Sequence, residues 1–162
     1  MNYSFGTDEY IQHVLYKYSS MLIRLAFTYT KNVTDAEDVV QDVYVNLIQR
    51  GMGFESEEHE KAWLIRVTIN KCKNRLKSAW NRCNVPLNED ISYLPEEESE
   101  VLTTVLNLPV KYRTIIHLFY YENYSIKEIS KMLKRSPGTV GTWLARGRKL
   151  LKKELIGGID YE

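Results

Sequence analysis

The chain has 162 residues, of which 44% are hydrophobic and 27% charged, and its formal net charge is +1. This composition is ordinary for a folded protein and excludes a chain that is disordered throughout. No uncharged apolar run approaches the roughly 18 residues that a membrane span needs, and the first residues lack the features of a signal peptide, so we expect a cytoplasmic protein without membrane insertion.

The first 50 residues predict two amphipathic helices. From residue 8 to 31, apolar side chains recur every three or four positions, which is the spacing of one helix face. Thr34 and Glu37 have the spacing of a capping box, so we expect the second helix to begin there and Gly51 to end it. The sequence GMGFESEEHE, residues 51–60, is interpreted as a loop.

Residues 61–80 predict a third helix that has one buried side and one basic side. This stretch holds six Lys and Arg residues and no carboxylate. Its apolar stripe comprises Ile65, Ile69, Cys72, Leu76 and Ala79. The polar stripe beside it comprises Arg66, Asn70, Lys73 and Lys77. A polyanion is one partner for such a stripe, and a solvated helix face is the alternative that charge alone leaves open.

An acidic linker is expected over residues 82–100. This stretch loses helical periodicity, contains two prolines, and holds six carboxylates against one arginine. Fully extended, it reaches roughly 65 Å, the length of about 19 base pairs of DNA. We therefore expect two small helical modules rather than one domain.

The second module is predicted to contain a helix-turn-helix. Helices are expected at 101–106, 110–121, 126–133 and 137–155. Ser125 and Glu128 have capping-box spacing where the third begins, and Ser136 followed by Pro137 begins the fourth. Only a short turn, Lys134-Arg135, separates these last two helices, which is typical of a helix-turn-helix.

The last helix is predicted to have an inner face and a basic outer face. The residues expected to pack inward are Val140, Leu144, Gly147, Leu151 and Leu155. The opposite face comprises Thr139, Thr142, Arg146, Lys149 and Lys153. Residues 101–156 hold 11 Lys and Arg residues against three carboxylates, which favours DNA as a partner over a structural hairpin with a solvated face.

No catalytic, metal or cofactor site is expected. The sequence contains neither a nucleotide-binding loop nor the pattern of a catalytic triad. Cys72, Cys83 and His59 lack the spacing of zinc ligands, so the cysteines are interpreted as reduced thiols. The carboxylates of residues 37–42 leave a metal-dependent nuclease as the enzyme alternative.

Three segments of the chain resemble a known protein family. The most specific elements are the sequence DAED of residues 35–38, followed by Gln41-Asp42, and Leu108-Pro109 ahead of Tyr112-Arg113. With these elements, residues 21–49 and 61–79 resemble region 2, and residues 106–155 resemble region 4, of sigma-70-type RNA polymerase sigma factors. Within that family the resemblance is to the extracytoplasmic-function (ECF) group.

The resemblance implies an all-α fold of two small helical domains joined by a flexible linker. Region 2 would occupy residues 1–81, the linker 82–100, and the region 4 helix-turn-helix 101–162. Such a protein would bind core RNA polymerase, recognise the −10 and −35 elements of a promoter and promote promoter melting. A partner anti-sigma factor is expected as well. The alternative function is a stand-alone helix-turn-helix regulator that does not engage polymerase.

The resemblance also assigns residues to each partner. Core polymerase would bind Asp35, Asp38, Gln41, Asp42 and Asn46. The single-stranded −10 element would contact Lys61, Trp63, Arg66, Asn70, Lys73, Asn74 and Lys77. The −35 duplex would contact Arg135, Ser136, Thr139, Thr142, Trp143, Arg146, Lys149 and Lys153. Residues 51–60 lie where the family builds a pocket for a flipped −10 base, and Trp63 could either stack on an unpaired base or lie in the core.

The recognition helix departs from the family at three positions. Gly141, Trp143 and Ala145 stand where the family usually has cationic or aromatic side chains. A bidentate arginine–guanine contact is therefore absent at position 141. Base readout is expected to shift toward the neighbouring hydroxyl side chains and Trp143, which predicts a different promoter choice with the grip on the duplex retained.

Overall fold

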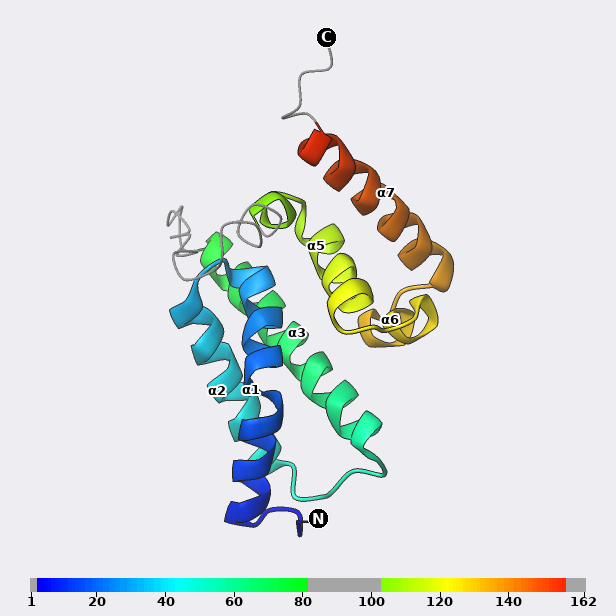
Figure 1. Cartoon of the computed structure of the whole chain (residues 1–162). Coiled ribbons are helices and arrows are strands. Elements are labelled where there is room, and N and C mark those ends of the chain that lie inside the picture. The colour runs from blue at the N-terminus through cyan, green and yellow to red at the C-terminus, as the bar shows by residue number, and fades with distance from the viewer. Residues whose placement is uncertain (1–2, 82–102, 157–162) are drawn as a thin grey trace. The chain divides into compact units, whose positions relative to one another are not determined.

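The computed structural model describes residues 3–81 and 103–156. The chain divides into two compact units, Met1–Asn88 and Glu89–Glu162, and the predicted linker at 82–100 lies outside the described residues. All regular structure in the described ranges is helical, which confirms the all-α fold class (Figure 1). No helix in these ranges is long and apolar enough to cross a membrane.

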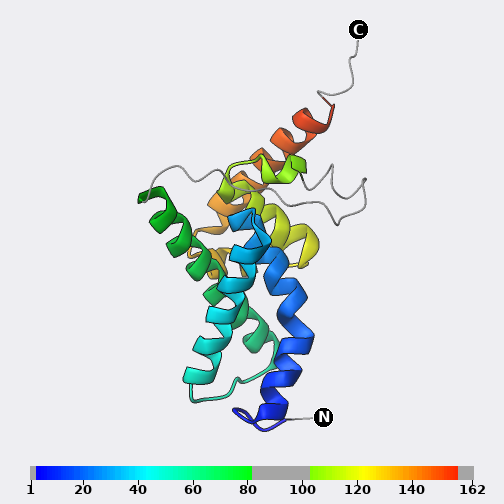
Figure 2. The same cartoon turned by 90° about the vertical axis from the view of Figure 1, so that its left-hand side faces the viewer.

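The first unit is a bundle of three helices. Helices α1 (Asp8–Thr30), α2 (Val33–Gln49) and α3 (Glu57–Asn81) each pack against the other two, as Figures 1 and 2 show from two sides. Side chains that are fully buried at the centre of the bundle include Val14, Leu22, Leu25, Val43, Leu47, Leu64 and Ile65. The three predicted helices are therefore confirmed, and their apolar stripes form one core.

The start of α2 differs from the prediction. The N-cap is Asn32, whose Oδ1 accepts a hydrogen bond of 3.0 Å from the backbone N–H of Asp35, so the capping box proposed for Thr34 and Glu37 is wrong. Lys31 adopts a left-handed conformation with φ of 54° at the end of α1. This sharp reversal leaves Asn32 extended, so Asn32 is available as a cap two residues earlier than expected.

Helix α3 begins at Glu57, four residues earlier than predicted. The hydroxyl of Ser56 accepts a hydrogen bond of 3.1 Å from the N–H of His59, as an N-cap side chain does. The first turn then carries Glu57, Glu58 and Glu60, which suit the positive end of the helix dipole. The acidic run that was interpreted as a loop is thus partly the first turn of a helix.

The second unit contains a short helical turn at 103–106, then α5 (Val110–Ile116), α6 (Ile126–Leu133) and α7 (Pro137–Ile156). The single helix expected over 110–121 continues from α5 into a π-helical segment, η1 (His117–Tyr121). Helix α7 packs against both α5 and α6. The buried apolar residues of this unit include Leu106, Ile115, Leu118, Ile129, Val140 and Leu144.

Close packing of α7 on α5 depends on Gly147. A Cβ atom at Gly147 would lie 3.1 Å from Cδ1 of Ile116 and 3.3 Å from Cβ of Tyr112, so the predicted close helix approach is confirmed. Leu155, also predicted to pack inward, is 38% exposed within the described residues. The reason is length: α7 has 20 residues against seven in α5, and its last turns extend beyond that helix (Figure 1).

Candidate nucleic-acid interface

Helix α6, which leads into the turn before α7, is fixed at both of its ends. Ser125 Oγ accepts from the N–H of Glu128, and Glu128 Oε1 accepts from the N–H of Ser125, both at 3.1 Å, which confirms the predicted capping box. At the other end, Lys134 is left-handed with φ of 54°. Ser130 Oγ donates to the carbonyl of Arg135 at 2.5 Å, and the Arg135 N–H donates to the carbonyl of Ser130 at 3.1 Å.

Helix α7 begins as the sequence predicts. Ser136 Oγ accepts a hydrogen bond of 3.1 Å from the N–H of Thr139, and Pro137 is the first helical residue. The Ser136 hydroxyl also donates to Thr139 Oγ1 at 2.9 Å. Two of the hydroxyls proposed to read bases are thus bonded to each other at the tip of the helix.

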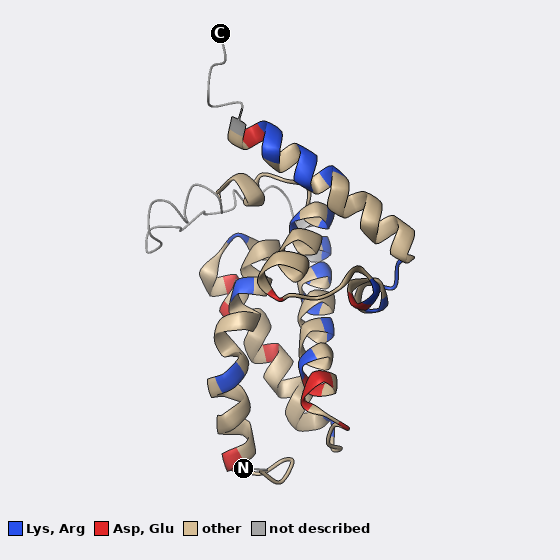
Figure 3. Ribbon diagram, turned by 45° about the vertical axis from the view of Figure 1, so that its right-hand side comes forward, with Lys and Arg blue, Asp and Glu red and all other residues tan. Residues whose placement is uncertain are grey.

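The basic side of α7 faces solvent and its apolar side faces α5 and α6. Val140, Leu144 and Gly147 are buried, and Leu151 is half-buried. The exposed residues proposed for the −35 element are Arg135, Ser136, Thr142, Arg146, Lys149 and Lys153, with Thr139 half-buried. Figure 3 shows cations on the C-terminal half of α7 and in the turn before it. This unit therefore presents one basic helix face that a polyanion can reach.

Trp143 is half-buried and in contact with two cations. Lys111 Nζ lies 5.3 Å, and Arg135 Cζ 5.6 Å, from the centroid of its indole ring. Gly141 is not held by crowding, because a Cβ there would meet only Cδ1 of Ile126 at 4.0 Å. The absence of a side chain at position 141 is therefore not a packing requirement of this unit.

Helix α3 has the two sides predicted for it. Leu64, Ile65, Thr68, Ile69 and Cys72 are buried, and Leu76 is half-buried, while the side chain of Ala79 lies outside the described residues. The exposed residues proposed for the −10 element are Arg66, Asn70, Lys73, Asn74 and Lys77, and Lys61 and Trp63 are half-buried. Figure 3 shows the cations of α3 distributed along the length of the helix.

The ring of Trp63 lies in an aromatic cluster at the start of α3. Its centroid is 5.5 Å from that of Phe54, and Arg50 Cζ lies 4.4 Å from the Phe54 ring and 5.3 Å from the Trp63 ring. Because the side chain is only half-buried, Trp63 is not a core residue in the sense of the fully buried Leu64. Part of its surface remains accessible beside the basic stripe of α3.

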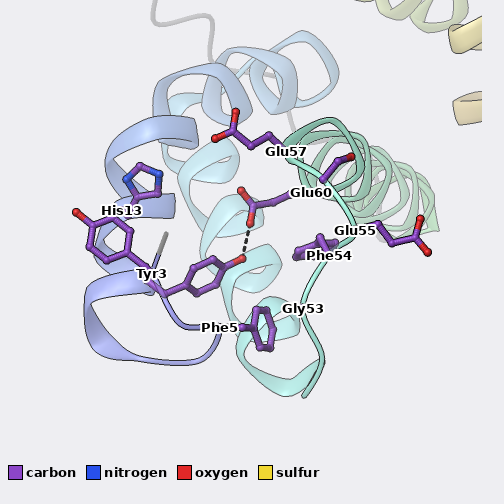
Figure 4. A pocket seen from close by; sticks show the side chains of 10 residues that line it. Tyr3, Phe5, His13, Gly53, Phe54, Glu55, Glu57 and Glu60 are labelled. Carbon is purple, nitrogen blue, oxygen red and sulfur yellow. Dashed lines mark hydrogen bonds between the residues drawn. The ribbon is translucent and has the colours of Figure 1, made fainter. Parts of the chain in front are cut away.

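An open pocket of about 430 Å³ lies where the loop after α2 meets the N-terminal ends of α1 and α3 (Figure 4). The lining residues are Tyr3, Phe5, Tyr10, His13, Gly53, Phe54, Glu55, Ser56, Glu57 and Glu60. The Tyr10 hydroxyl donates to Glu60 Oε2 at 2.5 Å. Burial, followed by the bond to Glu60, raises the pKa of Tyr10 well above its usual range, so the phenol stays protonated and holds that carboxylate.

Two acidic residues of α2 form ion pairs with a cation of the neighbouring helix. Arg75 of α3 places Nη2 2.8 Å from Asp35 Oδ1 and 3.6 Å from Asp38 Oδ2. Asp38, Gln41 and Asp42 are exposed, while Asp35 and Asn46 are half-buried. The same helix also exposes Val45 and Ile48, by 49% and 60%. The proposed polymerase-binding face is therefore mixed, with carboxylates, an amide and apolar side chains.

The cysteine and histidine that lack the spacing of zinc ligands have other contacts in the structure. Cys72 is fully buried in the first unit, and burial raises the pKa of its thiol to about 12. His59 Nδ1 accepts a hydrogen bond of 3.2 Å from the N–H of Glu55, and Cys83 lies outside the described residues. Among the described residues, no three His, Cys, Asp or Glu side chains gather as a metal site. Cys72 is thus a packing residue.

Two family models match this chain, and together they cover most of it. The model of sigma-70 region 2 matches residues 15–82, and that of sigma-70 region 4 matches residues 98–151. The chain belongs to the sigma-70 family. It is a sigma factor of the ECF group, with a role in transcription initiation.

Two curated relatives match over most of this chain and most of their own length. The ECF RNA polymerase sigma factor SigW of Bacillus subtilis is 26% identical, over 93% of this chain and 91% of its own. SigM of Mycobacterium tuberculosis is 28% identical, over 94% of this chain and 81% of its own. Among solved structures, the sigma factor RpoE of Bartonella quintana, crystallised with the anti-sigma factor NepR, matches with a TM-score of 0.74 and 18% identity, over 95% of this chain and all of that one. CnrH, solved in complex with the cytosolic domain of CnrY, matches with a TM-score of 0.70 and 22% sequence identity, over 96% of this chain and 92% of that chain.

Several side chains near the interfaces of this sigma factor were missed by sequence reasoning. Lys111 lies in α5, 32 positions before the tryptophan whose ring it covers. Tyr3, Phe5 and His13 line the pocket from a segment that lies some 40 residues before the loop. Arg75 was counted only as part of the positive charge of its helix. None of these contacts has a local spacing pattern that could have revealed it.

Proposed function

We propose that this sigma factor binds core RNA polymerase, recognises the −10 and −35 elements of a promoter and promotes melting of the −10 element. The supporting observation is the division of charge between exposed helix faces. Helix α3 and helix α7 present cations, while α2 presents Asp38, Gln41 and Asp42. Carboxylates disfavour DNA, so the face of α2 needs a different, basic partner, for which we propose the polymerase.

For the −35 duplex we propose that the N-terminal end of α7 enters the major groove. Arg146, Lys149 and Lys153 would then contact phosphates along the exposed side of the helix. Thr142 is exposed near the tip, where it would reach base edges. Because position 141 is glycine, no bidentate arginine–guanine contact forms there, and readout would depend more on the hydroxyls and on DNA shape.

For the −10 element we propose that α3 follows the backbone of the non-template strand. The exposed side chains from Arg66 to Lys77 supply cations and amides for phosphates, and the accessible part of Trp63 supplies an aromatic surface. A base that leaves the duplex would enter the pocket beside the loop, between its aromatic side chains. The carboxylates that also line this pocket would repel phosphates, but an uncharged base can donate hydrogen bonds to them from its amino group. Trapping the unpaired strand shifts the melting equilibrium, so the protein needs no catalytic group of its own.

We further propose that an anti-sigma factor restrains this protein in the cytoplasm. RpoE, which shares its fold, was co-crystallised with the anti-sigma factor NepR, and CnrH, which also shares it, was solved in complex with the cytosolic domain of CnrY. The region 2 unit, residues 1–81, and the region 4 unit, residues 101–162, would act through the linker between them. An inhibitor that covers the exposed face of α2 would prevent polymerase binding without touching the DNA-binding helices.

Run-off transcription tests the proposal directly. Core RNA polymerase is combined with the purified chain and genomic template, and the 5′ ends of the transcripts are sequenced. We expect new start sites that share sequences about 10 and 35 base pairs upstream. A stand-alone regulator would instead retain DNA in a binding assay and create no start sites, which is the result that would refute a sigma-factor mechanism.

A further inference from the structure

Trp143 joins three parts of the helix-turn-helix unit. The residue itself belongs to α7, Lys111 belongs to α5, and Arg135 belongs to the turn between α6 and α7. Both cations lie over the indole ring, Lys111 Nζ at 5.3 Å and Arg135 Cζ at 5.6 Å from its centroid, and Lys111 Nζ also lies 5.0 Å from the centroid of the neighbouring Tyr112 ring. Tryptophan is the aromatic side chain that attracts cations most strongly at such distances.

This arrangement places two positive charges near one ring. Each cation is attracted to the ring, but the two repel one another, and an anion close to both would relieve that repulsion. Lys111 and Arg135 are both exposed, so a ligand in solution can reach them. The ring is half-buried and fixed in α7. The site therefore fits a phosphodiester, which carries one negative charge and several acceptor oxygens.

The backbone of Arg135 is already fixed before any ligand binds. Its carbonyl accepts from the Ser130 hydroxyl at 2.5 Å, and its N–H donates to the Ser130 carbonyl at 3.1 Å. Only the arginine side chain remains free to move, and the indole restricts it. A preorganised cation loses less conformational entropy when it binds a phosphate than a mobile one does.

We propose that Trp143 is a positioning residue, which holds Lys111 and Arg135 as a pair that binds one segment of the DNA backbone, and that it does not read a base. This proposal rests on the proposed −35 duplex binding and adds Lys111 to that interface. Cations over the indole compete with any base for the same ring surface. The family usually has an arginine at this position, whose side chain could contact DNA directly. In this chain Trp143 acts indirectly, because it positions Lys111 and Arg135 and these two residues contact the phosphate.

The test measures binding of the full-length chain to a DNA duplex that is first obtained by selection from a random pool. Affinity is determined by fluorescence anisotropy at several salt concentrations. Each phosphate contact contributes about 0.9 to the slope of log affinity against log salt. We expect Trp143→Ala to weaken binding by about tenfold, to lower the slope by between about 1 and 2, and to leave the selected sequence unchanged. Trp143→Phe, which keeps an aromatic ring, should retain most of the affinity and most of the salt slope.

Lys111→Ala and Arg135→Ala supply a second test that does not disturb packing, because both side chains are exposed. In the wild type each should lower the slope by about 0.9, whereas in the Trp143→Ala background each should lower it much less. The proposal is overturned if Trp143→Ala changes base preference with the slope unchanged, or if Lys111→Ala changes neither affinity nor slope. If the wild-type chain selects no duplex at all, the proposed −35 function itself fails, and with it this inference.

Discussion

The region 2 and region 4 units of this sigma factor hold their surface cations in different ways. In region 2, two cations pair with carboxylates on neighbouring helices: Arg75 contacts Asp35 and Asp38, and Lys17 Nζ lies 3.3 Å from Glu57. A third cation of this unit, Arg50, lies over aromatic rings instead. In region 4, arginine and lysine side chains rest on aromatic rings. Arg148 Cζ, for example, lies 5.3 Å from the Phe119 ring and 5.4 Å from the Tyr120 ring.

This difference affects what each unit can bind. A carboxylate neutralises a cation and must be displaced before a phosphate can take its place, whereas an aromatic ring orients the cation and leaves its charge uncompensated. The region 4 unit therefore has cations ready for a polyanion. Under the proposed assignments, the region 2 unit would present DNA and polymerase with separate faces of adjacent helices, and the ion pairs between α2 and α3 would lie at the boundary.

The largest effect is expected from reversing the charge of Asp42. This carboxylate is exposed on α2, and no ion pair with it is seen among the described residues. If the face binds a basic surface of core polymerase, Asp42→Lys places like charges together and should weaken holoenzyme formation by at least about tenfold. Co-purification with polymerase measures this, with binding to the −35 duplex unchanged.

Glu9→Lys is the matched control for charge, since Glu9 is an exposed carboxylate at the start of α1. It should leave holoenzyme formation intact. Equal losses in both variants would mean that net charge alone, rather than this face of α2, governs the association.

The next effect concerns base selectivity in region 4. The space at position 141 admits a side chain, because the nearest atom to an added Cβ is 4.0 Å away. Gly141→Arg should therefore create a bidentate contact with guanine worth about 1–3 kcal/mol of discrimination. Selection from a random duplex pool should then show a new guanine in the −35 element. An unchanged preferred sequence would contradict the placement of this part of α7 in the major groove.

Arg146→Ala and Arg148→Ala compare two exposed cations of the same helix, of which only Arg148 is shown resting on aromatic rings. Arg146 is proposed to contact a phosphate, so its loss should lower the salt slope of duplex binding by about 0.9 for all sequences alike. The Nε–H of Arg148 donates to the Tyr120 hydroxyl at 2.5 Å, and its guanidinium lies over the two rings. Arg148 is thus directed toward η1 and lies on a different face of α7 from Arg146, two positions earlier, so Arg148→Ala should leave the slope unchanged. A sequence-selective loss for Arg146→Ala would refute a phosphate contact.

The features that the sequence predicted well are those set by neighbours along the chain. Apolar spacing placed the helices, and the caps at Ser125 and Ser136 follow from hydrogen bonds between residues three apart. The capping box at Thr34 failed because Asn32 offers an equally good cap once Lys31 turns the chain. Local rules cannot choose between two adjacent caps, because the choice depends on how α2 packs against α1.

The features that the sequence did not predict are those set by packing between distant segments. The basic and apolar stripes of α3 could be read from a period of 3.6, but its pairing of Arg75 with α2 could not. In the same way, the exposed cations of α7 were predicted, whereas the contact of Trp143 with Lys111 was not. The candidate faces were therefore predictable, and the partners that hold their side chains were not.

The smallest effect is expected from removing the ion pair that joins α2 to α3. Arg75→Met keeps the aliphatic part of the side chain and deletes the contacts with Asp35 and Asp38. These groups are more than a third exposed, so the loss in unfolding free energy should not exceed about 1 kcal/mol at low salt. It should vanish near 1 M salt, where charges are screened within about 3 Å.

Urea denaturation at two salt concentrations measures the Arg75→Met effect, and Arg66→Met, at an exposed position of the same helix, is the control. Arg75→Met also releases two carboxylates on the proposed polymerase-binding face. The extent of holoenzyme formation should therefore be retained and its rate should be equal or higher, although the free energy of unfolding of the sigma factor falls. A loss of holoenzyme instead would mean that polymerase requires Asp35 and Asp38 in the arrangement that Arg75 imposes. In that case the contact between α2 and α3 would be part of the interface, rather than a competitor of it.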